Sequence, residues 1–418
     1  MKKLYLMIIL LVALSGSLFG ENPYEKYSSD FVRINVQSLE KQLFMEYNNR
    51  EFKTMTMAKA AFIASGVTSK PELDAYMTRF DAVIKGIKKN YPNLSSLPQR
   101  RQGEIILKYI HKHVFKKYLF WSTTFKHIFD KGEFNCLISA VFFNAVCEEF
   151  NLKTRGTTNY NHAVSMFYAG NVVYRVETTN NGRFKPVSQG EARKDKTYNN
   201  VQLVAAVWGN LSAYSHKAGE FEKGIALGYK SLRLSPVNRE SLMNFKANYD
   251  GLAGRYIYDK KFLSAISLSR EIMDKFPNDK DFQKNISTYI ALQNSHYIQK
   301  REFDKAKSFL DEQKKSHPGL KIFGKLYRSI YIQKGIYLHD QKEFGETVAN
   351  YEAGLKEFPN DKILYNNYMV VLNNYIVYLI KKENFSQALN ISESARLKYP
   401  KEKVFQKYSR HCKRKLKK

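Results

Sequence analysis

The chain has 418 residues, a hydrophobic fraction of 44 % and a net charge of +29, with 68 Lys and Arg against 39 Asp and Glu. This length suggests two domains, or one domain followed by an array, and the apolar content is ample for buried cores. The basic residues are scattered and only the tail "KRKLKK" is a dense run, so we interpret most of the charge as solvated surface rather than as a footprint for nucleic acid or anionic lipid.

The first twenty residues are typical of a secretory signal peptide. A short basic start, "MKK", precedes the apolar run "LYLMIILLVAL" and the small residues of "SGSLFG". The apolar run is too short for a membrane span of about 20 residues. We therefore predict a signal peptide at 1–20 and a periplasmic or secreted mature chain without a nucleic-acid partner. The alternative is an uncleaved segment that associates the chain with a membrane.

Residues 21–115 show helical spacing of apolar residues, for example in "MAKAAFIASG" and "RRQGEIILKYIHKHVF". We predict this range as the mostly helical N-terminal part of a catalytic-type domain. The sequence contains no glycine-rich phosphate loop and no paired Cys or His spacing typical of zinc, and His111 and His113 should face different directions on one helix. We therefore expect no cofactor and no metal ion.

The stretch "GEFNCLISAVFFNAVCEEF" at 132–150 places Cys136 where a helix should begin. Polar turn residues precede it and a long apolar run follows. The N–H groups and the dipole of a helix start stabilise an anion, so a thiolate is favoured at Cys136. Cys147 lies deep in the same run and should be an inert core residue.

The three cysteines cannot all pair within one chain. On one helix, Cys136 and Cys147 would be about 16 Å apart, far beyond the roughly 7 Å between Cα atoms that a disulfide allows. A thiol that stays unpaired outside the cytoplasm is expected to be either buried or chemically functional. Cys136 is the cysteine that we predict to be functional.

Two β-type runs follow within 116–200, "HAVSMFY" and "VVYRVETT", joined through Gly170 and Asn171 in a two-residue hairpin turn. In that register Tyr168 faces Val173, and His162 and Glu177 become diagonal neighbours on one face, roughly 7–8 Å apart at the backbone. A Cys, a His and a carboxylate are what nucleophilic thiol catalysis requires, because the His takes the thiol proton and the carboxylate orients the ring.

This succession resembles the transglutaminase-like superfamily: a Cys at a helix start, "NHAV" opening a strand, and "YRVETT" on the next strand. The resemblance covers about 100–185 and implies a papain-like fold over 116–200. It implies Cys136 as nucleophile, His162 as general base and acid, and Glu177 as the orienting carboxylate. The family usually carries Asp at the third position. The residue before the nucleophile is here Asn135.

The shared chemistry of that family is thiolate attack on a carboxamide, release of an amine, and resolution of the thioester by water or by a second amine. The backbone N–H of Cys136 is one candidate oxyanion donor. Tyr118 and Trp121 are weaker candidates, and we expect both to be core residues.

The range 201–418 repeats with a period of 41 residues. Each unit reads as a long first helix, a turn near a Phe, a second helix with a small residue near its start, and a stop at a Pro. The Phe residues are Phe221, Phe262, Phe303, Phe344 and Phe385, the small positions are Gly224, Ala265, Ala306, Thr347 and Ala388, and the Pro residues are Pro236, Pro277, Pro318, Pro359 and Pro400.

This half resembles the tetratricopeptide repeat family, whose usual period is 34, so the extra residues should lengthen either a helix or the loops. The expected fold is thus an α+β papain-like or transglutaminase-like domain followed by an all-α tetratricopeptide-like solenoid. We predict a cysteine-dependent acyl-transfer enzyme, either a protease or amidase or of the transglutaminase type, that acts on amide bonds of proteins or peptides. The repeats would bind a protein partner or the substrate. The alternative is a catalytically inactive envelope scaffold.

Overall fold

The structure is a computed structural model that describes residues 24, 28–47, 49, 51–159, 162–180, 183–188, 197–276 and 279–417, with side chains at 158 and 159 excepted. The predicted signal peptide lies outside these residues. The chain divides into two compact units, Met1–Arg255 and Tyr256–Lys418. No helix within the described ranges has the length and apolar content needed to cross a membrane.

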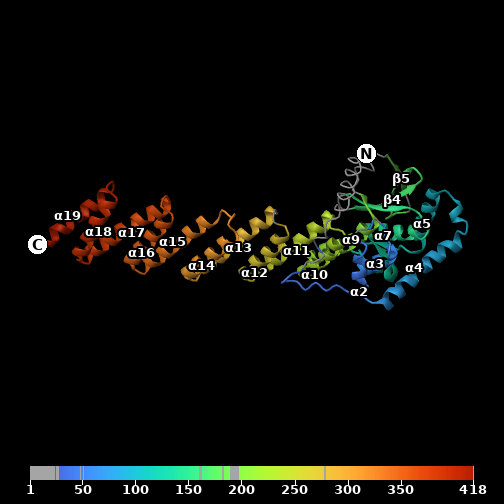
Figure 1. Cartoon of the computed structure of the whole chain (residues 1–418), viewed down its shortest axis with the longest axis horizontal. Coiled ribbons are helices and arrows are strands. Elements are labelled where there is room, and N and C mark those ends of the chain that lie inside the picture. Colours follow the sequence, from blue (N-terminus) through green and yellow to red (C-terminus); the bar gives the residue numbers. More distant parts are fainter. Residues whose placement is uncertain are drawn as a thin grey trace, which may run out of the picture. The chain divides into compact units, whose positions relative to one another are not determined.

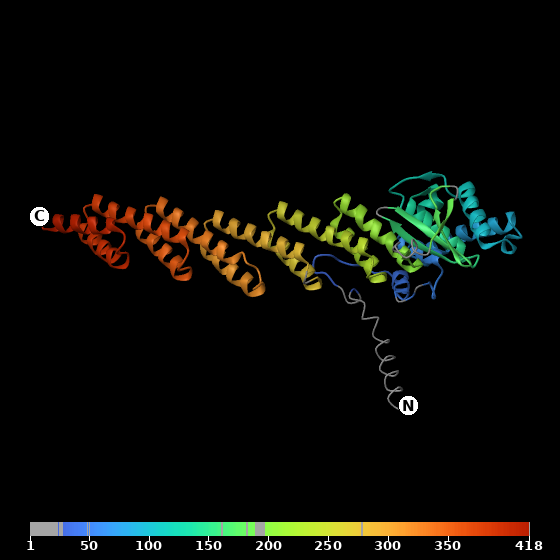
Figure 2. The same cartoon turned by 90° about the horizontal axis from the view of Figure 1, so that it is seen from above.

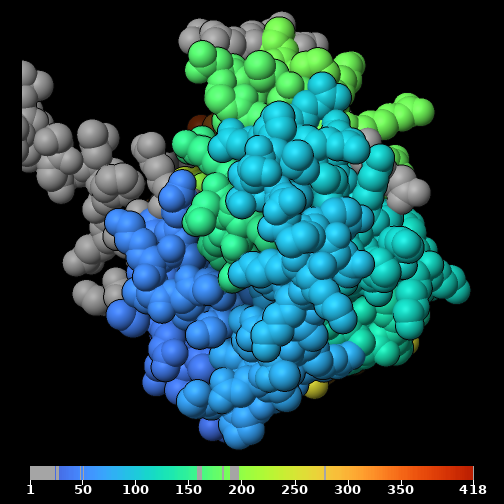
Figure 3. Space-filling model, turned by 90° about the vertical axis from the view of Figure 1, so that its right-hand side faces the viewer, coloured from blue at the N-terminus to red at the C-terminus, as the bar shows by residue number. Residues whose placement is uncertain are grey.

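The N-terminal unit begins with helices, as predicted for 21–115. They are α2 (Ser38–Phe44), α3 (Met57–Ala64), α4 (Lys70–Asn90), the 3₁₀ turn η1 (Leu94–Ser96) and α5 (Gln99–His113). Side-chain caps start two of them, because the hydroxyls of Thr56 and Ser69 accept the backbone N–H groups of Lys59 and Glu72. Figure 3 shows the face of this unit over which α4 and α5 lie, in blue to cyan.

A mixed α/β region follows and contains a five-stranded antiparallel sheet of order β6-β5-β4-β3-β7. Its elements are β1 (Lys117–Tyr118), α6 (Phe125–Lys131), β2 (Glu133–Phe134), α7 (Cys136–Glu148), β3 (Thr154–Asn159), β4 (His162–Ala169), β5 (Val172–Glu177), β6 (Arg183–Val187) and β7 (Thr197–Tyr198). The short strands β1 and β2 form a separate parallel pair.

The β4–β5 hairpin has the predicted register. Tyr168 pairs with Val173, Ala169 pairs with Val172, and the turn between them is Gly170-Asn171. Gly170 has a φ of +55°, a conformation that a residue without a Cβ adopts at little cost. The turn length therefore decides which side chains of the two strands share a face.

Helix α7 is the centre of the core, and each of its residues from Cys136 to Cys147 is buried. It packs against β3 and β4 on one side and against α3, α5 and α9 (Asn200–Lys217) on the others. Figure 1 shows β4 and β5 above α7 with α3 below it, and Figure 2 shows the strands side by side from above. The sheet and the helices thus fix both ends of α7.

Paired helices make up the rest of the chain. They are α9 and α10 (Phe221–Leu234), α11 (Arg239–Tyr258), α12 (Phe262–Lys275), α13 (Lys280–Gln299), α14 (Phe303–Ser316), α15 (Phe323–Asp340), α16 (Phe344–Glu357), α17 (Lys362–Lys381), α18 (Phe385–Lys398) and α19 (Lys403–Leu416). Each second helix starts at the predicted Phe and ends two residues before the predicted Pro. Second helices have 14 residues and first helices 18 or 20, so the first helix is the longer member of each pair.

A left-handed residue forms the turn inside every pair, two positions before the Phe. These residues are Gly219, Lys260, Arg301, Lys342 and Glu383, with φ between +58° and +73°. Only the first is a glycine, although residues with a Cβ pay roughly 1–2 kcal/mol in this conformation. The repeat therefore has a fixed turn geometry that could not be predicted from its residue types.

The small positions after each Phe are fully buried, as the repeat pattern predicts. Ala265, Ala306, Thr347 and Ala388 have no exposed surface. At Gly224 a Cβ would clash with the side chain of Asn248 in the neighbouring first helix. These positions allow the two helices to approach closely.

Candidate active site

The residue before Cys136 builds the helix start on which the thiol lies. The side-chain oxygen of Asn135 accepts the backbone N–H of Ile138 at 3.0 Å, and its amide nitrogen donates to the Phe120 carbonyl at 3.1 Å. Both ends of the Asn135 amide are thus occupied structurally. The predicted start of the helix at Cys136 is confirmed.

None of the three cysteines, all of which lie in the described part of the chain, forms a disulfide. Cys147 and Cys412 have no exposed surface, whereas Cys136 is 8 % exposed. Burial raises the pKa of the Cys147 thiol well above its ordinary value, which fits the predicted inert core residue. Cys136 is therefore the cysteine with a path to solvent.

The β4–β5 hairpin brings His162 and Glu177 into contact. Nε2 of His162 lies 2.6 Å from Oε2 of Glu177. With Nε2 bonded to the carboxylate, the neutral ring carries its hydrogen on Nε2 and its lone pair on Nδ1. Nδ1 is therefore the atom left to exchange a proton.

The Glu177 carboxylate is held at both oxygens. Oε1 accepts the backbone N–H of Thr179 at 3.1 Å and its hydroxyl at 2.6 Å, while Oε2 meets His162. Burial alone would raise the pKa of Glu177, but the hydrogen bonds from Thr179 and His162 outweigh it and lower that pKa below its ordinary value. One carboxylate therefore bonds to both Thr179 and His162.

A buried network fixes the strand end that carries Glu177. The hydroxyls of Thr178 and Ser139 are 2.8 Å apart, and Ser139 also donates to the Cys136 carbonyl at 3.0 Å. Nε2 of His111 lies 3.0 Å from the Thr178 carbonyl, and burial lowers the pKa of this ring. The network ties β5, α5 and the first turn of α7 together, so the carboxylate and the thiol share one frame.

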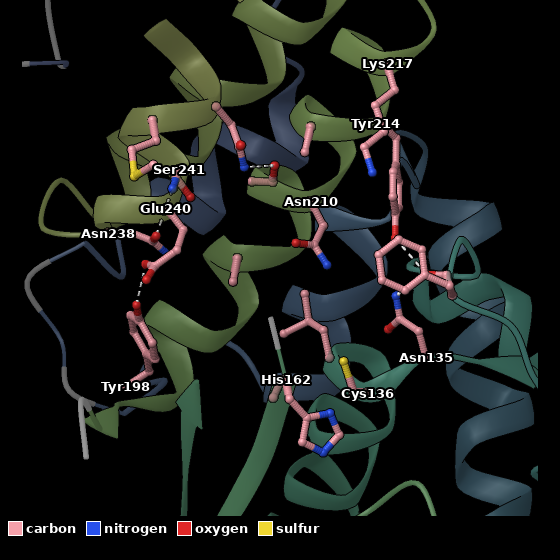
Figure 4. Close-up of a pocket in the computed structure, with 18 residues that line it drawn as sticks. Asn135, Cys136, His162, Tyr198, Asn210, Tyr214, Lys217, Asn238, Glu240 and Ser241 are labelled. Carbon is pink, nitrogen blue, oxygen red and sulfur yellow. Dashed lines mark hydrogen bonds between the residues drawn. The ribbon is translucent and has the colours of Figure 1, made fainter. Parts of the chain in front are cut away.

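Cys136 and His162 line a cavity of about 420 Å³ (Figure 4). The start of α7 supplies Cys136, and the sheet supplies His162 and Ala163 from β4 and Tyr198 from β7. The other walls come from the first helices of the array, mainly α9 and α11, through Ala206, Gly209, Asn210, Ala213, Tyr214, Lys217, Asn238, Glu240, Ser241, Met243 and Asn244, and from Phe120, Asn135 and Leu137. The size is that of a small-ligand site.

The expectation that Tyr118 and Trp121 are core residues is wrong. Trp121 is 65 % exposed and Tyr118 is 45 % exposed, and both belong to the short, largely exposed segment around β1. Partial burial, then the charge of Cys136 and a hydrogen bond with its side chain, raise the pKa of the Tyr118 hydroxyl, while a bond with the Cys136 backbone acts in the opposite direction. Tyr118 therefore lies directly at the thiol.

Tyr214 and Phe120 complete this side of the site. The Tyr214 hydroxyl donates to the Phe120 carbonyl at 2.6 Å, the same carbonyl that accepts from Asn135. Burial raises the pKa of Tyr214 to about 12, so the hydroxyl stays protonated near neutrality. The segment that carries Phe120 is thus fastened both to α9 and to the start of α7.

Among the described residues, no group of three or more His, Cys, Asp or Glu side chains is placed to hold a metal ion. No protein-family model matches this chain, and no curated protein matches its sequence significantly. Any assignment of function therefore depends on the geometry of the site.

The structure brings together the predicted His162–Glu177 pair and places Cys136 in the same cavity as His162. Sequence reasoning missed the supporting residues Ser139 and Thr178 and the cavity wall from α9 and α11. Nothing in the pattern marks Ser139 or Thr178, because single hydroxyl residues in an apolar helix and at a strand end are common. The cavity wall arises from tertiary contacts of the first repeat.

Proposed function

We propose that the protein is a cysteine-dependent acyl-transfer enzyme that acts on amide bonds of peptides or proteins, with Cys136 as nucleophile, His162 as base and acid, and Glu177 as orienting carboxylate. The observation that carries the proposal is the 2.6 Å contact of His162 with Glu177 beside a cavity that Cys136 also lines. A helix-start thiol, an imidazole and a fixed carboxylate are the parts that thiol catalysis needs.

In this mechanism Nδ1 of His162 takes the thiol proton and Glu177 stabilises the resulting imidazolium. The Cys136 sulfur attacks the amide carbon, and the carbonyl oxygen gains the negative charge. The amine leaves with the proton from Nδ1, and a thioester remains. Water or a second amine then attacks the thioester, which gives hydrolysis or transfer and restores the thiol.

The oxyanion would lie at the first turn of α7, where the N–H of Cys136 is not used by the helix's own hydrogen-bond ladder. The Tyr118 hydroxyl interacts with both the side chain and the backbone of Cys136. A hydroxyl whose pKa is raised remains a donor at neutral pH, so Tyr118 is the second donor in this proposal. The Asn135 amide is excluded, since both of its ends are engaged.

A central helix that starts at the nucleophile and packs on an antiparallel sheet supports a papain-like, transglutaminase-like fold for the N-terminal unit. The phased helix pairs support a tetratricopeptide-like array, which would bind a protein partner or a large substrate. The apolar opening of the sequence supports action outside the cytoplasm. There, the burial of Cys147 and Cys412 would protect their thiols.

Alkylation with iodoacetamide at neutral pH tests the proposal. We expect selective labelling of Cys136, located by peptide mapping, with Cys147 and Cys412 as internal buried controls. His162→Ala should slow the labelling, because the thiolate loses its counter-charge. Labelling of Cys136 no faster than that of a free cysteine would contradict the enzyme and support the inactive scaffold instead.

A further inference from the structure

Two side chains of opposite charge line the cavity on opposite sides. Figure 4 shows Lys217 on one side and Glu240 on the other, with Asn210 between them and Cys136 below. In the part of the chain that the structure describes, neither has an ion-pair partner within 4 Å. The cavity is therefore polar at two separate points.

Neighbouring side chains hold each of these charged groups in place. The Lys217 ammonium lies 5.5 Å from the centre of the Phe120 ring and 6.0 Å from that of Tyr214. Glu240 accepts a hydrogen bond of 2.7 Å from the Tyr198 hydroxyl. Aromatic faces attract a cation without neutralising it, and a phenol leaves a carboxylate its charge. Both groups remain available to a ligand of opposite charge.

Helix ends account for part of this pattern. Lys217 is the last residue of α9 and Glu240 lies in the first turn of α11, the ends that favour a cation and an anion respectively. Dipoles explain the residue types, but they do not require that both side chains line one cavity with a nucleophile. Asn210 and Asn244 add amide groups to the same walls, and amides pair with peptide backbone groups.

We infer that the cavity takes a short zwitterionic peptide, with a carboxylate of the peptide at Lys217 and an ammonium group at Glu240. This inference rests on the proposed function and narrows its substrate class to short peptides with free charged groups. The first helices of the array would then set the specificity of the site. A large folded protein does not present a free carboxylate and a free ammonium group close enough together to enter one small cavity.

Binding can be measured without chemistry, on the full-length Cys136→Ala chain, by calorimetry. The probes are alanine peptides of about three to five residues, and each residue spans about 3.4 Å in an extended chain. Each length is used in four forms: free, N-acetylated, C-amidated, and blocked at both ends. Lys217→Gln and Glu240→Gln are the test variants. Lys223→Gln on α10 is the control, because it removes the same charge from an exposed position outside the cavity.

We expect the free peptide to bind at least about tenfold more tightly than either singly blocked form, because blocking one end removes one charge-assisted hydrogen bond. C-amidation should cost nothing further in Lys217→Gln, and N-acetylation nothing further in Glu240→Gln. Lys223→Gln should leave all four forms unchanged. This crossed pattern assigns each end of the peptide to one residue.

Equal affinity of all four forms for Cys136→Ala, or no measurable binding of any of them, would overturn the inference. So would Lys217→Gln and Glu240→Gln chains that behave like Lys223→Gln. The iodoacetamide rate at Cys136 in the natural chain reports separately on the proposed function. Fast labelling without charge-dependent binding would leave the enzyme and remove only the peptide specificity.

Discussion

Glu148 near the end of α7 should make the stability of the N-terminal unit depend on pH. Burial raises the pKa of this carboxyl to about 7, against an ordinary value of 4.5, although the backbone N–H of Met57 donates to it at 2.8 Å. A raised pKa means that the folded chain favours the protonated form. The stability that this form contributes is complete below pH 4.5 and is lost as the pH rises through about 7.

At about 1.4 kcal/mol per tenfold change in proton affinity, the rise from 4.5 to about 7 corresponds to about 3 kcal/mol. Because the side chain is only partly buried, we expect Glu148→Gln to stabilise the unit by about 1–3 kcal/mol at pH 8, relative to its effect at pH 4.5. The amide oxygen still accepts from Met57, so the hydrogen bond is retained.

Urea unfolding followed by tryptophan fluorescence measures this effect in the N-terminal unit alone, since Trp121 and Trp208 both lie there. The control is Asp81→Asn, which makes the same chemical change at an exposed position of α4. Asp81→Asn should show no pH-dependent difference from the natural chain. If Glu148→Gln changes the free energy of unfolding equally at pH 4.5 and pH 8, the argument from burial is refuted.

Replacing Glu177 by Gln should slow iodoacetamide labelling of Cys136 about 10–100-fold at pH 7. The reason is that the hydrogen bond of His162 to a charged carboxylate, worth about 1.5–3 kcal/mol, is weakened. An unchanged labelling rate would show that the carboxylate does not activate the thiol. Gly224→Ala should lower the free energy of unfolding by about 1–3 kcal/mol, since the new methyl group meets the Asn248 side chain, whereas Gly254→Ala, with open space around it, should raise it by up to about 1 kcal/mol. A similar result for both glycines in urea titrations would contradict the packing argument. Lys342→Gly should stabilise the C-terminal unit by up to about 1 kcal/mol in circular dichroism melts, because glycine adopts the left-handed conformation at this position without the strain that a Cβ causes. A loss of stability would show that the Lys342 side chain stabilises the unit by more than this strain destabilises it.

The sequence predicted those parts of the fold that depend on local patterns. The start of α7 at Cys136, the two-residue turn at Gly170 and the second helix of each pair, between a Phe and a Pro, all follow from periodicity, turn chemistry or the special backbone of proline. The contact of His162 with Glu177 could be predicted because a two-residue turn fixes the register. A local rule was sufficient in each of these cases.

Features set by tertiary contacts were not predicted. Lys260, Arg301 and Lys342 adopt left-handed turns although their residue types give no hint of it, because the two packed helices fix the geometry of the turn between them. Tyr118 was expected to be a core residue, whereas the short β1 segment that carries it is largely exposed. The α9 and α11 walls of the cavity arise from contacts between segments distant in sequence, which no window of residues reveals.

The cavity beside Cys136 uses array residues only as far as Asn244, while the 41-residue pattern continues to Pro400. Whole units beyond Tyr256 can therefore be duplicated or deleted without removing any residue that lines this cavity. Descendants of this gene would be free to lengthen or shorten their helical extension while the residues around Cys136 are inherited unchanged.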